Sequence, residues 1–220
     1  MAQISFFKST IGRKQLVGIT GLALSGFLLS HVLGNFLIFL GPEVYNKYSY
    51  ALVSNPLLYL AEVGLLLIFL GHLSLATIVN LKNRNARPVK YAMAATGDKE
   101  TSNVTKSMWY QGIIIAVFLV LHILTFKLGT FYEVTYGGVQ MRDLHKLIVE
   151  VFRDPVYVVG YIMCLLVLGM HLSHGLQSSI RTLGFNHPKY EPKIAWLSYF
   201  FAAFIAFGFI SQPLYVYFLY

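Results

Sequence analysis

Charge is scarce in this chain: Asp, Glu, Lys and Arg make up 12% of its 220 residues, and 56% of the residues are hydrophobic. A soluble domain usually carries about 25% charged residues, so the composition argues against a soluble globular protein. The mean hydropathy is +0.62 and the pI is near 9.5. The basic residues lie between apolar runs and do not form one soluble basic face. Membrane orientation therefore explains them better than nucleic-acid binding.

Cysteine is almost absent, since Cys164 is the single one and it lies in an apolar run. One thiol excludes a disulfide framework, and no C-x-x-C-H motif is present for covalent haem attachment. The first residues, MAQISFFKSTIGRK, are polar, and the apolar run behind them is long enough to span a bilayer. We therefore expect no cleavable signal peptide.

Long apolar runs are what the sequence has in abundance. A bilayer core of about 30 Å needs roughly 20 apolar residues as helix. Backbone groups in lipid must be satisfied within each span, and the alternation of a β-barrel is missing, so the spans are helical. The chain is predicted to be one all-α integral membrane domain over 1–220, with helices near 15–41, 56–81, 108–128, 153–180 and 194–219.

The distribution of Lys and Arg predicts the orientation of these spans. Twelve basic residues flank one side: Lys8, Arg13, Lys14, Lys82, Arg84, Arg87, Lys90, Lys99, Lys106, Arg181, Lys189 and Lys193. The other side has five: Lys47, Lys127, Arg142, Lys146 and Arg153. The positive-inside rule then places the N-terminus in the cytoplasm and the C-terminus outside. The longest outer connection, 129–152, is expected to act as a cap.

Five histidines fall within predicted spans, and the first four spans each carry at least one: His31, His72, His122, His171 and His174. Ionisable residues inside a membrane span are functional-site hypotheses by default. At 1.5 Å per residue, His31 and His122 belong to the outer half of the bilayer, and His72 and His171 to the inner half. The histidines therefore form two pairs at different depths.

Two bis-histidine haems fit this arrangement, because haem iron accepts neutral imidazole from both sides. A flat macrocycle needs small neighbours, and such residues flank the histidines: Gly26, Gly34, Gly71, Ser74, Gly169, Ser173 and Gly175. Small residues also serve ordinary helix packing, and a single membrane histidine can simply hydrogen-bond another helix. A zinc site is the competing interpretation, but its ligands would have to converge at one depth.

Several motifs together resemble the dihaem cytochrome b membrane anchor of bacterial succinate dehydrogenases and menaquinol:fumarate reductases, of the five-helix, single-anchor type. They are STIGRKQLVGITGL, SHVLGNFLIFLGPEVYNKYSYAL, GHLSLATIVNLKNRNARPVKY, LHILTF and HLSHGLQSSIRTLG, which cover nearly the whole chain. The resemblance implies a four-helix bundle holding two b haems, with a fifth helix beside it. It also implies His31 and His122 as ligands of the distal haem iron and His72 and His171 as ligands of the proximal one.

The resemblance further implies a bacterial cytoplasmic membrane, an iron–sulfur subunit and a flavoprotein subunit as partners, and menaquinone or menaquinol as substrate. A dimer of heterotrimers is compatible with it. Electrons would pass between the iron–sulfur subunit and the quinone, while the succinate/fumarate site lies on another subunit. The cytoplasmic docking face would consist of the N-terminal segment and the loops 82–107 and 181–193.

Secondary site residues are also expected. Lys14, Ser178 and Arg181 lie where they would meet propionates of the inner haem, although interfacial cations also snorkel without a ligand. His174 would contact a propionate or a neighbouring helix. Glu43 is the first candidate for the proton acceptor of quinol oxidation and Glu62 the second. Some family members carry a glutamate at the position of Gly169, so a proton path there is in doubt.

Two rival functions stay open. The chain could be a dihaem b-type anchor of another quinone-linked enzyme, a hydrogenase or a formate dehydrogenase. It could also be a small transporter or a haem-free scaffold, although the broken helices typical of transporters are not visible.

Overall fold

A computed structural model describes Phe6 and residues 9–86 and 103–220. Five of its helices are long and apolar enough to cross a membrane: Thr10–Leu40, Leu57–Asn85, Val104–Lys127, Pro155–Thr182 and Glu191–Leu219. The predicted all-α multi-pass membrane architecture is thereby confirmed. Of the basic residues used to predict orientation, Lys8, Arg87, Lys90 and Lys99 lie outside the described residues, as does part of the predicted docking face.

The spans correspond to helices α1 (Thr10–Asn35), α3 (Leu57–Asn85), α4 (Asn103–His122), α6 (Pro155–Thr182) and α7 (Glu191–Leu219). Two of them continue in a different winding: α1 in the 3-10 turn η2 (Phe36–Leu40) and α4 in the π turn η4 (Ile123–Lys127). Local sequence sets their starts. Ser9 caps α1 by accepting a hydrogen bond from the Gly12 amide, so this helix begins about five residues before the predicted position 15. Asp154 caps α6 in the same way, with Pro155 in its first turn.

Two segments expected as connections are helical. The first is α2 (Pro42–Val53), which follows Gly41, and the second is α5 (Leu144–Phe152), which Asp143 caps. Between η4 and α5 lies a hairpin of β1 (Glu133–Tyr136) and β2 (Val139–Arg142). Its two-residue turn is Gly137–Gly138, and both residues have positive φ, the backbone conformation that a tight hairpin of this type requires.

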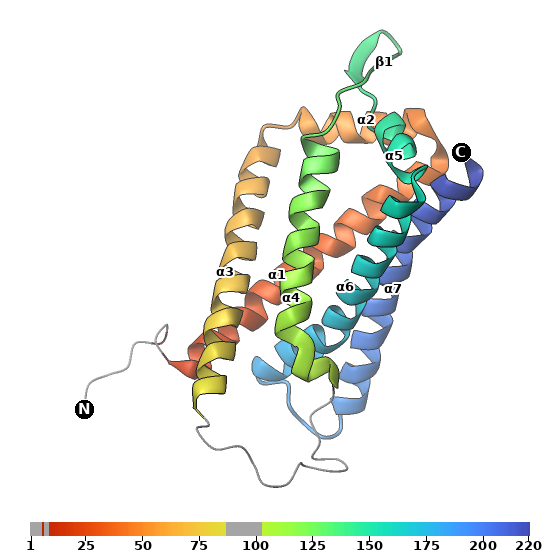
Figure 1. Ribbon diagram of the computed structural model, residues 1–220. Helices are drawn as coiled ribbons and strands as arrows, with labels where there is room; N and C mark the ends of the chain where they lie inside the picture. Colours follow the sequence, from red (N-terminus) through yellow and green to blue (C-terminus); the bar gives the residue numbers. More distant parts are fainter. Residues whose placement is uncertain (1–5, 7–8, 87–102) are drawn as a thin grey trace.

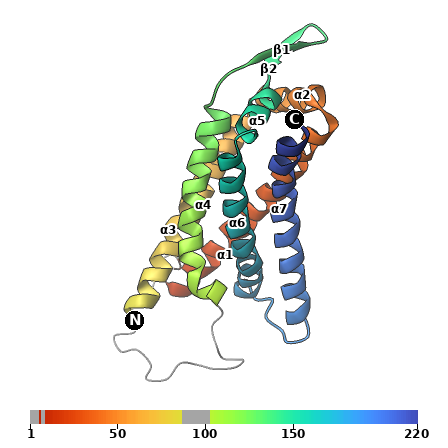
Figure 2. The ribbon, with the colours of Figure 1, turned by 45° about the vertical axis from the view of Figure 1, so that its right-hand side comes forward.

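These elements give the molecule two distinct ends (Figures 1 and 2). The capped end carries α2, α5, the hairpin and the C-terminus. The basic end carries the start of α1, the end of α3, the end of α6 and the start of α7. The 129–152 connection thus does form a cap over one end of the bundle, together with α2, which the sequence analysis did not anticipate.

The long helices pack unevenly. α1 crosses the bundle obliquely and contacts α3, α6 and α7, while α4 packs on α6 and only narrowly on α3 (Figure 1). α7 packs most extensively against α6. The main core joins α1, α6 and α7 and contains Val32, Leu165, Leu168, Leu172, Ala202, Ile205 and Ile210. α3 has no buried residue, so most of its apolar surface is available to lipid.

Candidate functional site

Two membrane histidines meet near the capped end. The ring centroids of His31 (α1) and His122 (α4) lie 6.0 Å apart, and the two ring planes are nearly perpendicular at 88°. A metal ion held between two imidazoles would put their centres about 6 Å apart, because each metal–nitrogen bond is about 2 Å and each nitrogen lies about 1 Å from its ring centre. The separation therefore suits two opposed axial ligands.

Aromatic rings enclose this pair. Phe27 stacks on His31 at 5.2 Å and Phe209 lies 5.5 Å from it. Phe118, Phe126 and Tyr161 lie about 6 Å or less from His122 or one another. The polar partners are few: Tyr161 Oη lies 3.4 Å from His122 Nδ1, and Asn35 Nδ2 donates to the His31 carbonyl at 2.8 Å.

His72 (α3) is oriented by α1. Its Nδ1 lies 3.2 Å from the Val17 carbonyl oxygen and 3.0 Å from Thr20 Oγ1. The Thr20 hydroxyl itself donates to the Leu16 carbonyl at 2.7 Å. Both neighbours of Nδ1 can therefore accept its proton, which leaves the lone pair on Nε2. Metal-binding histidines usually show this pattern, with the non-ligating nitrogen donating to a carbonyl or similar acceptor.

A glycine permits the approach of α1 to this ring. A Cβ added to Gly21 would lie 3.2 Å from His72 Cε1 and 3.4 Å from Ser179 Oγ. Ser179 is buried, whereas the prediction named its neighbour Ser178, which is only half-buried. The α6 hydroxyl that lies near His72 thus belongs to Ser179, one residue after the predicted Ser178.

His171 (α6) lies against α4. A Cβ added to Gly112 would lie 3.8 Å from His171 Cε1. His171 Nδ1 is buried and has no hydrogen-bond partner in the described part of the chain. No ring contact of the kind that joins His31 and His122 is described between His72 and His171.

The expected propionate partners are dispersed at the basic end. Arg181 is ion-paired with Glu191 of α7, and Lys14 is exposed. His174 Nδ1 lies 3.2 Å from Thr105 Oγ1 on α4. The structure brings none of Lys14, Ser178 and Arg181 into a described contact with His72 or His171, so their roles stay predictions.

The two carboxylate candidates differ in position. Glu43 is exposed on α2 and forms an ion pair with Lys47 one turn later, 2.6 Å between Oε1 and Nζ. Glu62 on α3 is ion-paired with Lys127 of the π turn, five residues after His122. Glu62 is therefore the better placed of the two relative to His122, although neither carboxylate contacts His31 or His122 in a described interaction.

Two of the small residues thought to accommodate a macrocycle, Gly169 and Gly34, serve helix packing instead. A Cβ on Gly169 would lie 3.0 Å from the Ala206 Cβ, so this position faces α7. Gly34 packs under the Tyr48 ring of α2. The close approach between α6 and α7 explains why Gly169 has no side chain. The glycines that contact imidazoles are Gly21 and Gly112, and the sequence analysis named neither.

The donor set fits bis-histidine haem. Two imidazoles per layer suffice for one iron, and His31, His122 and His72 have their rings placed by the chain itself. Within Phe6, 9–86 and 103–220, no group of three or more His, Cys, Asp or Glu side chains converges in a way that could hold a metal ion.

Comparison with family models, curated proteins and solved structures finds no match for this chain.

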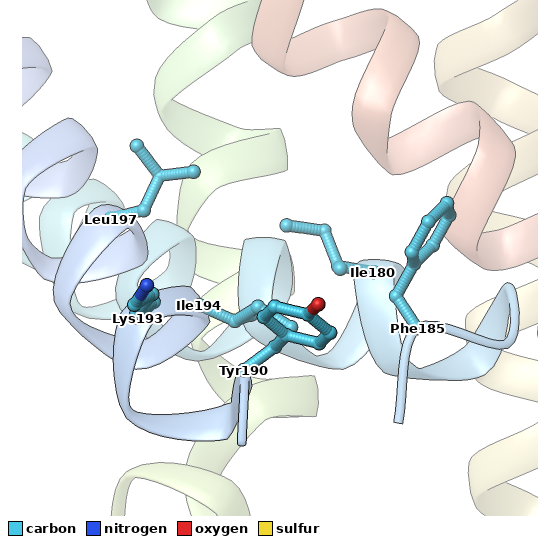
Figure 3. Close-up of a pocket in the computed structure, with 6 residues that line it drawn as sticks. All are labelled: Ile180, Phe185, Tyr190, Lys193, Ile194 and Leu197. Atoms are coloured by element: carbon cyan, nitrogen blue, oxygen red, sulfur yellow. The ribbon is translucent and has the colours of Figure 1, made fainter. Parts of the chain in front are cut away.

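An apolar groove lies at the basic end, opposite the His31–His122 pair. Figure 3 shows Ile180 of α6, Lys193, Ile194 and Leu197 of α7, and Phe185 and Tyr190 of the loop between them around it. The groove has a volume of about 310 Å³. Among the described residues that line it there is no histidine and Lys193 alone is charged, so its chemistry suits an apolar group better than a redox cofactor.

A polar cluster at the capped end was missed by the sequence analysis. His145 of α5 is 4% exposed and Asn46 of α2 is fully buried. Asn46 Nδ2 donates to Asp143 Oδ1 at 2.8 Å, and the His145 amide donates to Asn46 Oδ1 at 3.0 Å. The available signal was His145 itself, a histidine two residues after the capping Asp143, at the start of an apolar run.

Proposed function

We propose that this chain is a dihaem cytochrome b that anchors a soluble electron-transfer enzyme to the bacterial cytoplasmic membrane. The observation that carries the proposal is the opposition of His31 and His122, 6.0 Å apart, in a helix bundle whose other long helices bring two more histidines to a second depth. His31 and His122 would hold one haem, and His72 and His171 the other. When bound, the haems would supply reversible one-electron transfer across the membrane.

The protein's own contribution is placement. The Val17 carbonyl and Thr20 hydroxyl fix the tautomer and direction of His72. The aromatic side chains around His31 and His122 exclude water from the pair, which lowers the local dielectric and stabilises neutral imidazoles. Helix α7 carries none of the proposed ligands, but it contributes Phe209 to the surroundings of His31 and packs on α6 and α1.

More specifically, we propose that the chain is the membrane anchor of a succinate:menaquinone oxidoreductase, an enzyme that works as succinate dehydrogenase or as fumarate reductase. Its support is the set of motifs around His31, His72, His122 and His171, quoted above. In this proposal the basic end faces the cytoplasm and docks the iron–sulfur subunit, which carries the flavoprotein. Menaquinone or menaquinol reacts toward the capped end, and the proton acceptor there is Glu43 or Glu62.

Spectroscopy on the purified chain tests the haem proposal. We expect a b-type band in the reduced-minus-oxidised spectrum and two haems per chain by extraction. His31→Ala and His122→Ala should each remove one haem, and the double variant should lose no more than either single variant. His72→Ala and His171→Ala should behave in the same way for the other haem.

His187→Ala is the matched control, because His187 is exposed in the loop before α7 and should leave both haems in place. A chain without any b-type band would refute the haem proposal and leave the scaffold or transporter. Additive haem losses in the His31/His122 double variant would refute the pairing. Reconstitution with soluble subunits distinguishes the proposed succinate:quinone enzyme from a hydrogenase or a formate dehydrogenase.

A further inference from the structure

A buried imidazole stands at the capped end, outside the four proposed ligands. His145, in the first turn of α5, is 4% exposed, and its Nε2 is buried without a hydrogen-bond partner in the described part of the chain. Buried side-chain nitrogens are nearly always hydrogen-bonded, and an exception calls for a chemical explanation. Simple packing does not explain it, since an apolar side chain would fill the same place without leaving a nitrogen unsatisfied.

The chain holds this imidazole firmly. The His145 amide donates to Asn46 Oδ1 at 3.0 Å, and Asn46 Nδ2 donates to Asp143 Oδ1 at 2.8 Å. Asp143 also accepts from the Lys146 amide at 2.9 Å, which starts α5. The backbone that carries the ring is therefore fixed to both α2 and the turn before α5.

The ring lies between a buried tyrosine and an exposed one. On the inner side, the Tyr45 ring centroid is 6.4 Å away, and the Tyr45 hydroxyl donates to Asn35 Oδ1 at 3.0 Å. Asn35 in turn donates to the His31 carbonyl at 2.8 Å. On the outer side, the Tyr220 ring centroid is 5.3 Å away, and Tyr220 is 44% exposed. Hydrogen bonds thus join Tyr45 to the neighbourhood of His31, and ring contacts place His145 between Tyr45 and the exposed Tyr220.

We propose that His145 relays protons between the buried side of the cap, beside Tyr45, and the solvent beside Tyr220. In each transfer the imidazole takes up one proton at a ring nitrogen from the inner side and releases one to the outer side, so no charge accumulates. The inference rests on the proposed function, in which quinol oxidation near His31 releases two protons that must leave the membrane on this side.

The groups that face His145 are compatible with this role. Tyr45 approaches from α2, Tyr220 from the end of α7, and Asp143 from the turn before α5. The π turn and α6 also pack against α5, but Lys127 and Tyr161 on these elements meet Glu62 and His122. Burial lowers the pKa of His145, and the Asp143 carboxylate opposes that effect. The imidazole is then mostly neutral at pH 7 and able to accept a proton.

Direct titration tests the relay without depending on haem. The full chain, labelled with ¹⁵N-histidine, is placed in lipid nanodiscs and followed by NMR, and the His145 signal is assigned by its loss in His145→Gln. We expect this signal to titrate reversibly below about pH 6.5, the ordinary value for histidine. An imidazole that stays neutral down to about pH 4, well below that value, would overturn the proposal.

Kinetics test the direction of transfer. Reduction of the chain's b-type band by a short-chain menaquinol should be about tenfold slower in His145→Gln at pH 7, with unchanged haem content and a flattened pH profile. Free imidazole should restore the rate in His145→Ala, an effect that a purely structural role would not produce. His187→Gln is the control and should match wild type.

The outcomes separate the two proposals. A wild-type rate and pH profile in His145→Gln would overturn the relay while leaving the dihaem function intact. A chain that lacks a b-type band but shows a titrating His145 would overturn the dihaem function. In that case the relay would lose the reaction that it serves and would fail with it.

Discussion

Replacing Asn46 by alanine should release the cap from the bundle. The substitution removes the bond to the Asp143 carboxylate, worth about 1.5–3 kcal/mol for a charged partner, and leaves the His145 amide unsatisfied at a cost of about 1–3 kcal/mol. Partial solvation of the opened site offsets some of this, so we expect local opening of α5 to become easier by about 3 kcal/mol. At 1.4 kcal/mol for each factor of ten, amide exchange should accelerate about a hundredfold.

Hydrogen exchange measured by mass spectrometry, on the chain in nanodiscs, provides the assay. Peptides covering 143–152 should show the acceleration, while peptides from the middle of α6 should not. Gln140→Ala is the control, because Gln140 makes an exposed hairpin bond to Glu133 at 2.7 Å and should change exchange by less than about threefold. Unchanged exchange at 143–152 in Asn46→Ala would show that the buried amide does not hold the cap.

The remaining predictions address packing, pH and ion pairing. Gly169→Leu should lower the free energy of unfolding by about 1–3 kcal/mol in thermal melts, because its side chain would collide with α7, whereas Gly64→Ala, with open space around it, should be neutral or better. Because burial lowers the pKa of His145, the open cap binds a proton at a higher pH than the closed cap does. The rate of amide exchange at 143–152, corrected for the intrinsic pH dependence of exchange, should therefore rise as pH falls below about 6.5 and stay flat above it. A His145→Gln variant with the same pH dependence would contradict this. Glu62→Gln and Lys127→Met should each cost less than about 1 kcal/mol, since both partners are partly exposed, and a double-mutant cycle with a larger coupling would refute that estimate.

The sequence predicts the spans well because their signal is local. An apolar run of about 20 residues has few other stable structures in lipid, so all five spans match the expected regions. The boundaries move by a few residues where caps decide them, as at Ser9 and Asp154. The hairpin was also within reach, because Gly137–Gly138 between EVTY and VQMR is a recognised turn signal.

The cap helices were harder to predict because tertiary contacts stabilise them. The segment of α2 mixes polar and apolar residues, and its helix is supported by Tyr45 and Asn46, which are buried against α5. Such long-range contacts leave no periodic pattern strong enough to distinguish a short helix from a polar loop.

The residues of the candidate site also differ in how far the sequence alone can predict their positions. Counting residues along each span suffices to place His31 and His122 at a common depth, and the structure brings these two rings together. Which backbone carbonyl faces His72, and which serine lies beside it, depends on the tilt and rotation of α1. Packing between helices sets those angles, and hydropathy carries no information about them. Val17, Gly21 and Ser179 therefore could not be named in advance.

The π turn after His122 gives α4 tolerance to changes in length. In this turn the Leu128 amide bonds to the Ile123 carbonyl, five residues back, so the segment holds one residue more than an α-helical turn would. Because the wider turn absorbs this extra residue, the winding before and after it stays nearly in phase. Deleting a single residue there would restore ordinary helical winding and leave the segment that follows in nearly the same orientation. His122 would keep its place, and the hairpin would still leave the end of the helix on the same side.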